Sequence, residues 1–408
     1  MEPIIPMSNK TVLPLVTIGG KKTTFQKSGF LAPSYKIEFN GEEIDKHIYR
    51  CVQEIVYESS EEMIDKLEIN FINPDFELNN LKMFLPGNEV SIWAGYNGQV
   101  QFLGRGIIYH HKVFFPKDGM STLEIKAYPK AFQMTEKRPL IKQKGERNAK
   151  RKKAVVHKKA SLDVVLGEIA DDWGFVKDID KCSVVNPTNQ PRTMSDYDFC
   201  TRLSNFADFH FWVDSNDKGK WVLHFRDPKK LLNDQEVSYH FKYNAGNETT
   251  LLEFEPEMVL TKQYAKVYTE MTLPNRKSVK ANFTEDKFDK KSQVTPEKQN
   301  EEILDSIQNP LKVKVFLDDI SFIIPGVYSI KTDKDLQAYV DRWLKRNREE
   351  FIMANGKTIG IPDLRARNEH ELSGLGKLYD GKWYFTNVKH RITEADGYWC
   401  DFDARKEF

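Results

Sequence analysis

The stretch Asn189-Gln-Pro-Arg-Thr-Met-Ser-Asp-Tyr-Asp-Phe-Cys-Thr-Arg-Leu-Ser-Asn-Phe-Ala-Asp-Phe-His-Phe-Trp-Val213 predicts a loop, a capped helix and a strand in immediate succession. Ser195 can accept a hydrogen bond from a backbone N–H of the first helical turn, where Asp196 and Asp198 are favourably placed. The aromatic run after the helix is too short for another helix and favours a strand. A compact α/β module is therefore expected in the middle of the chain. Its helix has one apolar face, made of Phe199, Leu203, Phe206 and Ala207.

Length and composition indicate a folded protein of several domains. The 408 residues allow two to four domains, and 40% hydrophobic with 30% charged residues is ordinary for a globular chain. A net charge of +1 argues against a surface built throughout for nucleic acid or anionic membrane. No apolar run is long enough for a membrane span, and no secretory signal is evident. Cys51, Cys182, Cys200 and Cys400 are far apart, which predicts free buried thiols.

The region before the α/β module is predicted to be almost entirely β. Residues 35–39 alternate in polarity, and Asn40-Gly41 suits a tight hairpin turn. A second hairpin is predicted around Asn97-Gly98. The expected product is an antiparallel sheet or a small barrel.

A strongly basic segment follows, at residues 137–159, with eleven lysines and arginines against one acid, Glu146. The simpler interpretation is a solvated connecting loop. The alternative is a docking surface for an acidic partner or for nucleic acid. The segment lacks aromatic residues that could stack on bases, which favours the loop.

The second half returns to strands after another helix of the α/β module, which Ser161 should cap and Gly174 should end. Strands are predicted at 251–254, 265–271 and 312–316, a helix at 333–350, and further strands to residue 402. The polar stretch 274–310 is predicted to be a mobile excursion. The predicted division is an N-terminal extension (1–33), a first β-barrel (34–136), a basic connector (137–160), an inserted α/β domain (161–250) and a second β-barrel (251–408).

The sequence predicts no catalytic, cofactor-binding or metal-binding residue. It has no phosphate-binding loop, dinucleotide fingerprint, H-E-x-x-H or nucleophile elbow. His110 and His111 are neighbours in a strand and should point to opposite faces. His390 is predicted to be a hydrogen-bonded structural histidine. Gly374-Leu-Gly376 is predicted to be a turn.

Three blocks in order resemble a known family. They are the Ala94-Gly-Tyr-Asn-Gly hairpin with Phe102-Leu-Gly-Arg-Gly, the central Gln190 and Ser195-Asp-Tyr-Asp-Phe, and the C-terminal Gly360-Ile-Pro, Gly374-Leu-Gly and Tyr384, His390 and Gly397-Tyr398. This series resembles the baseplate hub proteins of contractile phage tails, the late-control protein D family. The same fold forms the N-terminal hub part of the type VI secretion protein VgrG.

The resemblance implies a structural role rather than an enzyme. Such hubs form homotrimeric rings in which each subunit contributes two β-barrels, so the ring adapts a hexameric tail tube to a trimeric central spike. The expected location is the virion tail baseplate, after synthesis in the host bacterial cytoplasm. Expected partners are the tube protein and a spike protein, with tape-measure and baseplate wedge proteins as further candidates. Membrane binding and specific nucleic-acid binding are not expected.

The chain departs from VgrG at its end. Only six residues, 403–408, follow the last predicted strand, and they could reach no more than about 22 Å. The spike is therefore expected to be a separate polypeptide. Residues 1–33, 137–160 and 274–310 also fit the family pattern poorly.

Two other functions are alternatives to the hub. A tail-tip enzyme such as a peptidoglycan hydrolase would need a cleft with a glutamic acid as general acid. A carbohydrate-binding β-protein would expose tryptophans on one face, with Trp93, Trp383 and Trp399 as candidates, although their alternation with polar residues favours a place in the core.

Overall fold

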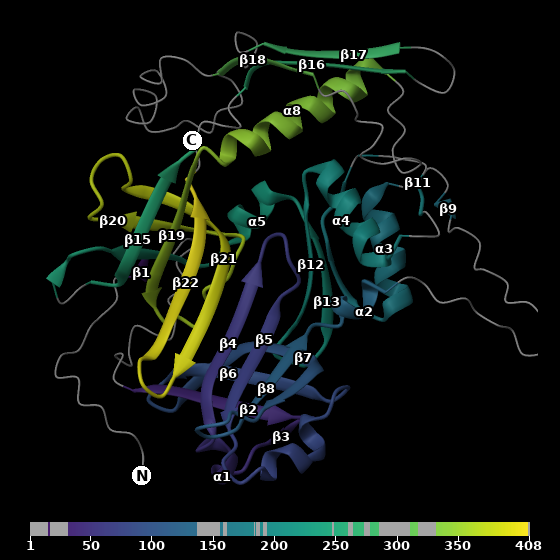
Figure 1. The fold of residues 1–408 in the computed structure, drawn as a ribbon. Helices are drawn as coiled ribbons and strands as arrows, with labels where there is room; N and C mark the ends of the chain where they lie inside the picture. The colour runs from purple at the N-terminus through teal and green to yellow at the C-terminus, as the bar shows by residue number, and fades with distance from the viewer. Residues whose placement is uncertain are drawn as a thin grey trace, which may run out of the picture.

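The protein is mainly β, with one large sheet, three small sheets and a group of helices (Figure 1). The computed structural model describes residues 15–16, 32–136, 156–157, 161–182, 184, 188–190, 194–246, 249–259, 264–272, 278–284, 311–316 and 332–406. Most strands of the 14-stranded large sheet follow the order β1 (Leu15–Val16), β14 (Ser238–Lys242), β20 (Asn368–Ser373), β21 (Gly381–Thr393), β4 (Val52–Ser60), β5 (Lys66–Ile72), β8 (Thr122–Tyr128), β7 (Gln99–Phe114), β6 (Glu89–Tyr96), β2 (Pro33–Phe39) and β3 (Glu42–Glu43). Three more extend from β21 in the order β22 (Gly397–Arg405), β19 (Ile352–Ile359) and β15 (Leu251–Met258).

Two halves of this sheet meet where β4 pairs antiparallel with β21, from Ser60 opposite Asn387 to Glu54 opposite Thr393. We call β2 to β8 the first β unit, and β14, β15 and β19 to β22 the second β unit. Figure 1 shows purple β4 and yellow β21 in the same sheet, although they come from opposite ends of the chain. The sequence predicted two small barrels. In the described residues the strands form one open sheet, and the pairing of β4 with β21 covers an edge of each unit with the other. The division into two barrels stays a prediction.

The turns of the first β unit follow from its asparagine–glycine pairs. Asn97 and Gly98 have φ values of 53° and 76°, as the tight turn between β6 and β7 requires, and Asn40 and Gly41 do the same between β2 and β3. Both predicted hairpins are confirmed. Short helical turns complete the unit: α1 (Lys46–Tyr49), η2 (Glu77–Asn80), η3 (Lys82–Phe84) and α2 (Ala131–Met134).

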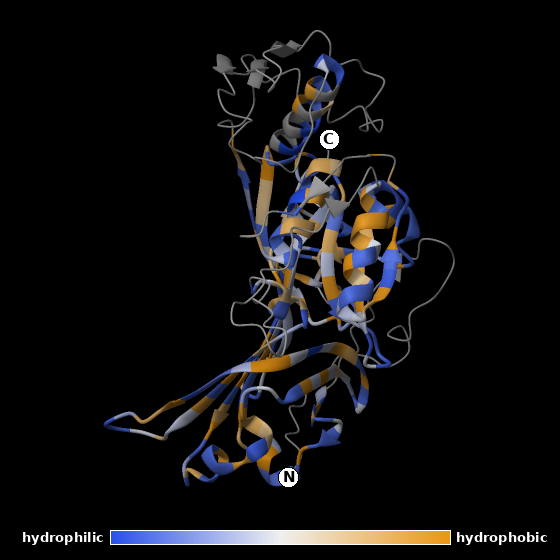
Figure 2. Cartoon of the chain, turned by 90° about the vertical axis from the view of Figure 1, so that its right-hand side faces the viewer, coloured by the Kyte–Doolittle hydropathy of each residue, from blue (hydrophilic) through white to orange (hydrophobic). Residues whose placement is uncertain are grey.

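The α/β unit lies on one side of the sheet and consists of α3 (Leu162–Trp173), α4 (Asp196–Ala207) and a three-stranded sheet of β10 (Val176–Ile179), β13 (Trp221–Arg226) and β12 (His210–Ser215). The cap predicted at Ser195 is confirmed, because its Oγ accepts from the Asp198 N–H at 3.0 Å. Ser161 precedes α3 as predicted, but its side chain makes no capping hydrogen bond. Gly174 ends α3 in the left-handed conformation. In Figure 2 the helices of this unit carry both orange and blue stretches, as amphipathic helices do.

After the α/β unit, α5 (Pro228–Asp234) leads into β14, which pairs with β20 of the second β unit. The positions of the predicted domain boundaries stay predictions. Of the basic segment, only the two-residue strand β9 (Val156–His157) lies within the described residues, paired with β11 (Thr188–Asn189). The rest of the basic segment and most of the N-terminal extension lie outside the described residues.

A third small sheet joins β16 (Tyr264–Thr272) to β17 (Ser278–Thr284) and β18 (Leu311–Phe316), beside the helix α8 (Asp333–Glu349) (Figure 1). The helix and the strands at β16 and β18 were predicted. β17 was not, because it lies within the polar stretch predicted to be an excursion. Its alternation of Val279, Ala281 and Phe283 with polar residues was the signal for a strand.

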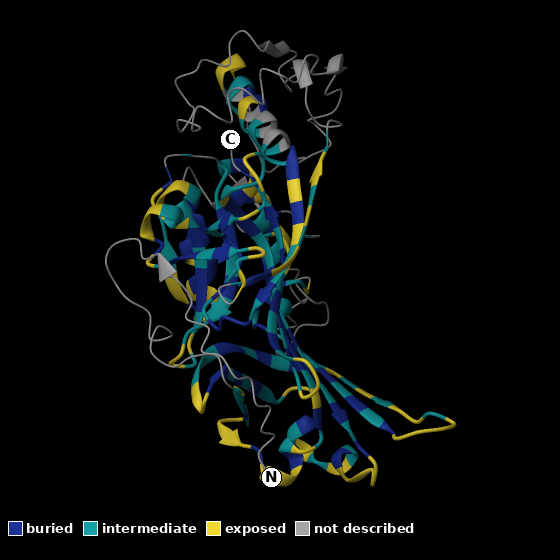
Figure 3. Cartoon of the chain, turned by 90° about the vertical axis from the view of Figure 1, so that its left-hand side faces the viewer, coloured by how far each residue is buried: buried dark blue, intermediate teal, exposed yellow. Residues whose placement is uncertain are grey.

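Two hydrophobic cores hold these parts together. The larger one runs through both β units, from Ile37 to Ala404, so that they share one interior. The smaller one fills the α/β unit and includes Ala131 and Met134 of α2. Figure 3 shows the buried residues concentrated in the central strands, with exposed residues at the hairpin ends.

Candidate functional site

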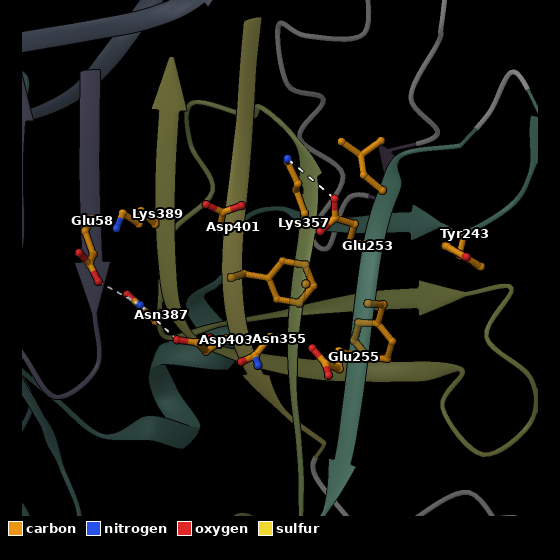
Figure 4. Close-up of a pocket in the computed structure, with 14 residues that line it drawn as sticks. Glu58, Tyr243, Glu253, Glu255, Asn355, Lys357, Asn387, Lys389, Asp401 and Asp403 are labelled. Carbon is orange, nitrogen blue, oxygen red and sulfur yellow. Dashed lines mark hydrogen bonds and ion pairs between the residues drawn. The ribbon is translucent and has the colours of Figure 1, made fainter. Parts of the chain in front are cut away.

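A shallow groove of about 640 Å³ lies on the second β unit and reaches across to β4 (Figure 4). Its walls come from β15, β19, β22, β21 and β4, three parts of the sequence that the sheet brings together. Two lysines, Lys357 and Lys389, line it. Five carboxylates also line it: Glu58, Glu253, Glu255, Asp401 and Asp403.

Most of these charges belong to one row across the outer face of the sheet. Neighbouring strands place opposite charges directly beside one another, and each such pair stabilises a sheet by roughly 0.2–1 kcal/mol. Figure 4 shows the middle of this row, with the Lys357–Glu253 ion pair at its end. The row therefore has no net charge. From β5 to β15 it consists of Lys66, Glu58, Lys389, Asp401, Lys357 and Glu253.

The adjacent row gives the groove its negative charge. There Asn387, Asp403, Asn355 and Glu255 stand side by side on β21, β22, β19 and β15, with two acids and no base. Asn387 Nδ2 donates to Asp403 at 3.2 Å and to Glu58 at 3.1 Å, which orients both carboxylates. This polar row is where a cationic ligand would be held.

β15 forms the rim of the groove and is built to resist pairing with another strand. Val259 donates its N–H to Phe351 O at 2.9 Å. Because alternate residues of an antiparallel strand bond to the same neighbour, the odd-numbered residues of β15 direct their N–H and C=O groups toward β19, and the even-numbered residues direct theirs away from it. Pro256 therefore lies where a backbone N–H would point to the open edge, and it has none to offer. Glutamates at alternate positions, including the exposed Glu257, add like charge along the same strand. A partner must approach across the face rather than extend the sheet.

The lining of the groove suits binding rather than catalysis. It has no histidine, cysteine, serine or threonine, and its carboxylates are beside lysines or asparagines. A general acid would need an apolar setting that keeps the carboxyl protonated. What the groove offers is a polar face for cationic side chains, while the rings of Phe254 and Phe402 pack toward the core on the other side of the sheet. This site was not predicted from the sequence. The alternating glutamates of β15 were the available signal.

A cysteine and a histidine lie close together beneath the same sheet, as a nucleophile and its base would. Cys400 Sγ lies 3.3 Å from His390 Nδ1, which also contacts the Tyr398 hydroxyl at 2.8 Å, while Nε2 contacts Leu364 O at 2.9 Å. Both residues are fully buried. Burial raises the pKa of the Cys400 thiol to about 12, so no thiolate forms at neutral pH. The interpretation of His390 as a hydrogen-bonded structural residue is confirmed.

One carboxyl has the raised pKa expected of a general acid, but it is enclosed. Burial raises the pKa of Asp65 to about 6, against the opposing effect of Arg367. Asp65 accepts from the Tyr57 hydroxyl at 3.0 Å and from the Ser60 N–H at 3.3 Å. With only 4% of its surface exposed, Asp65 has no access for a substrate. It ties β4 to the turn that follows it.

The α/β unit is joined to the sheet by a largely buried polar cluster. Glu61, after β4, accepts from Arg405 of β22 at 2.9 Å and lies 3.4 Å from His210 of β12. The Tyr384 hydroxyl lies 3.0 Å from His210 Nε2. Burial, and then the charge of Arg367, lower the pKa of His210 to about 3, so the imidazole is neutral. The cluster fixes the position of the α/β unit.

Inside the α/β unit, His224 lies between two carboxylates. Its Nδ1 is 2.7 Å from Asp178 and its Nε2 is 3.0 Å from Asp214, with the Trp212 ring stacked 4.3 Å away. Burial opposes protonation, but the two aspartates outweigh it and raise the pKa of His224 to about 9. The imidazolium joins β10, β12 and β13.

Replacing His224 with phenylalanine should therefore change how stability depends on pH. The raised pKa means that this group stabilises the fold fully below the unfolded pKa, about 6.5, and that the contribution is lost as pH rises through about 9. We expect the variant to be less stable than the parent by roughly 3 kcal/mol at pH 6, and the gap to narrow by pH 10. Urea unfolding at both pH values measures this. His110→Phe, at an exposed histidine, is the control, and an equal gap at both pH values would contradict the assignment.

The other residues considered from the sequence do not form a site. Among the described residues, no group of three or more histidine, cysteine or acidic side chains could hold a metal. Trp383 is fully buried, whereas Trp93 and Trp399 lie half-buried under Lys36 and Lys357, so the three do not share an exposed face. Of the four cysteines, all of them free, Cys51 is only half-buried, which differs from the prediction. In the described part of the chain, no helix has the length and apolar character needed to cross a membrane.

Comparison with known proteins identifies a family and a fold. The family model described as the Alg8 N-terminal domain matches residues 31–394. The matching family is not late-control protein D, the family predicted from the sequence. No curated protein matches the sequence.

Three solved structures are similar in fold. A tail protein from Neisseria meningitidis superposes with a TM-score of 0.61 at 12% identity, covering 92% of this chain and 97% of that one. The 43 kDa tail protein of a Shewanella oneidensis prophage gives a TM-score of 0.63 at 10% identity, with 91% and 98% covered. A component of the E. coli type VI secretion system, described as similar to two tail proteins of bacteriophage T4, gives 0.51 at 10% identity, with 88% and 74% covered. The predicted likeness to tail and type VI secretion proteins is thus confirmed for the fold.

Proposed function

The chain belongs to the family of the Alg8 N-terminal domain, and on this premise we propose that it is the structural baseplate hub of a contractile phage tail or a related injection particle. Three copies form a ring that adapts a hexameric tail tube on one side to a trimeric spike on the other. The protein acts in the assembled baseplate, after synthesis in the bacterial cytoplasm. Tape-measure and wedge proteins are further partners.

The observation that carries this proposal is the sharing of one sheet and one core by two β units. Because β4 pairs with β21 and the core runs through both units, the pair is rigid. Three such chains present six β units, which is the number that a hexameric tube requires, while the ring keeps the threefold symmetry of a spike. The likeness in fold to tail proteins over more than nine-tenths of this chain supports it.

The two β units act as barrels in this proposal, divided as the sequence suggests, with the α/β unit inserted between them. Support comes from the second unit, whose strands follow the order β15, β19, β22, β21, β20 and β14. The two end strands, β15 and β14, come close to one another. An isolated bridge from Tyr243 to Leu251 links the two ends. Contacts with the neighbouring subunit would cover the remaining edges.

The expected mass of the purified assembly is about three times the chain's 47.5 kDa. Light scattering or native mass spectrometry measures it, over a dilution series that would show weak association. A stable dimer formed through the α/β unit, leaving both β units free, would contradict the proposal. Release of muropeptides from peptidoglycan by the same preparation would favour the hydrolase instead, and binding of cell-wall glycans would favour the carbohydrate-binding protein.

A further inference from the structure

We propose that His370 is an acid-sensitive latch that holds β14 against β20, so that mild acid frees the strand through which the α/β unit is joined to the second β unit. β14 follows the α/β unit through α5, which contacts β20. In Figure 1, α5 lies between the α/β unit and β20. The registered pairing of β14 with β20 is short, from His240 opposite Glu371 to Lys242 opposite Ser373. The latch is a property of the single chain and does not depend on the proposed ring.

The first half of β14 and the turn before it contact β20 through side chains. Tyr239 donates its backbone N–H to His370 Nδ1 at 3.2 Å. Ser238 Oγ donates to Glu369 O at 2.9 Å. The Gln235 amide donates to Glu369 O at 2.8 Å and accepts from the Glu369 N–H at 2.9 Å. Of these groups only the imidazole can take up a proton near neutral pH, so the contact of Tyr239 with His370 is where pH acts.

This hydrogen bond requires a neutral imidazole. A backbone N–H can only donate, so Nδ1 of His370 is the acceptor and the ring proton is on Nε2. Nε2 has no hydrogen-bond partner within the described part of the chain. Protonation of Nδ1 would set its new N–H against the N–H of Tyr239. The pairing of β14 with β20 therefore excludes the charged form of His370.

Aromatic rings enclose His370 on the inner face of the sheet. The centroid of its imidazole lies 4.7 Å from that of Phe385 in β21, and 5.6 Å and 6.0 Å from those of Tyr239 and Phe241 in β14. The side chain is 1% exposed. A cation–π contact would stabilise a charged imidazole only in part, because the ring would have lost its water without finding an acceptor.

The charged and titratable side chains of the neighbouring strands lie mostly on the other face of the sheet, because they alternate in sequence with the inward-facing residues. They are Glu369 and Glu371 in β20, His240 and Lys242 in β14, and Lys382 and Tyr384 in β21. On the inner face, the titratable group beside the imidazole is the Tyr239 hydroxyl, which donates to Asp363 of the loop before β20. Burial alone lowers the pKa of His370 to about 3.

The direction of the pH effect follows from the two states of the latch. When β14 leaves β20, His370 meets water and binds a proton with the ordinary pKa of about 6.5. Below that pH the open state holds one proton more than the closed state, so closing is fully favourable above it and is weakened as the pH falls. The opening constant should rise about tenfold for each pH unit below about 6.5.

The test is amide hydrogen exchange of the full-length protein, followed by mass spectrometry from about pH 7.5 to about pH 5 and corrected for the intrinsic pH dependence of exchange. We expect the protection of the amides of β14 to fall about tenfold per pH unit below about 6.5. Strands β5 and β8 of the first β unit are the internal reference, and their protection should stay constant.

Matched variants assign the effect to one imidazole. In His370→Asn the amide oxygen occupies the position of Nδ1 along the side chain, so it can accept from the Tyr239 N–H, but it cannot be protonated. Protection of β14 in this variant should not change with pH over the same range. His240→Asn is the control, because it removes the half-buried histidine of β14 itself, which contacts Ser373 Oγ at 2.7 Å. It should keep the fall seen in the parent.

Three outcomes overturn the latch: constant protection of β14 in the parent, a fall that persists in His370→Asn, or an equal fall in β5 and β8, which would mean that acid unfolds the whole protein. If His370→Asn fails to keep β14 paired near neutral pH, the parent and His240→Asn profiles decide between local and global opening. The mass of the assembly tests the hub function separately, so either proposal can fail without the other.

Discussion

Replacing Glu61 with leucine should lower the free energy of unfolding by about 3 kcal/mol. Glu61 is the acceptor at which the sheet and the α/β unit meet, 2.9 Å from Arg405 and 3.4 Å from both His210 and the Tyr384 hydroxyl. The side chains of Glu61 and Arg405 are 13% and 17% exposed. Removing the carboxylate leaves a largely buried guanidinium that has lost its 2.9 Å partner and keeps its contact with Glu349 at 3.2 Å. Urea unfolding measures the loss.

Hydrogen exchange should locate the effect of Glu61→Leu in β12, because His210 loses a neighbour there. Glu61→Gln keeps a hydrogen-bond acceptor and the shape of the side chain but removes the charge. It should therefore lower the free energy of unfolding by less than Glu61→Leu does. Asp171→Ala, which breaks the exposed ion pair with Lys177, should cost less than about 1 kcal/mol. A Glu61→Leu protein as stable as the parent would contradict this prediction. It would mean that the cost of burying Glu61 and Arg405 cancels the attraction between their charges, and that other contacts hold the α/β unit in place.

The local elements could be predicted because each one follows from neighbouring residues. Ser195 is a cap because its hydroxyl reaches a backbone N–H three residues away, and Asn97-Gly98 is a turn because both residues tolerate positive φ. β17 shows the limit of composition as a signal. Residues 278–284 are polar on average, yet Val279, Ala281 and Phe283 alternate with polar residues in the sequence, and the alternation outweighs the average.

The joint between the β units could not be predicted, because nothing in β4 specifies β21. Each strand alternates apolar and polar residues, and any second strand of that kind would satisfy the pattern. The register of Ile55 opposite Ile392 is set by packing between residues from opposite ends of the chain. The groove was missed for the same reason. Charges at alternate positions are normal for a solvent-facing strand, and the surplus of acid arises only when β15, β19 and β22 lie side by side.

Replacing Trp383 with alanine should cost about 3–5 kcal/mol, the largest loss expected here for a single change. The indole is fully buried in the second β unit, edge-on to Phe254 with ring centroids 5.0 Å apart. Its Nε1–H donates a hydrogen bond to Tyr379 O at 2.8 Å. Alanine has no such donor, so the Tyr379 carbonyl would lose this partner. The substitution therefore removes packing, opens a cavity and loses a hydrogen bond together. Urea unfolding, with near-UV circular dichroism for the packing of the core, measures the effect.

Trp399→Ala is the matched control, because it removes the same side chain from the opposite face of the sheet. Trp399 is half-buried, with Lys357 4.7 Å above its ring, so its loss forfeits a partly exposed surface and a cation–π contact, about 1 kcal/mol. The loss in free energy of unfolding should be at least twofold larger for Trp383→Ala than for Trp399→Ala. Equal losses would mean that the outer face is as well packed as the core, and the groove beside Lys357 would then have to be regarded as part of a closed interior rather than as a surface for a partner.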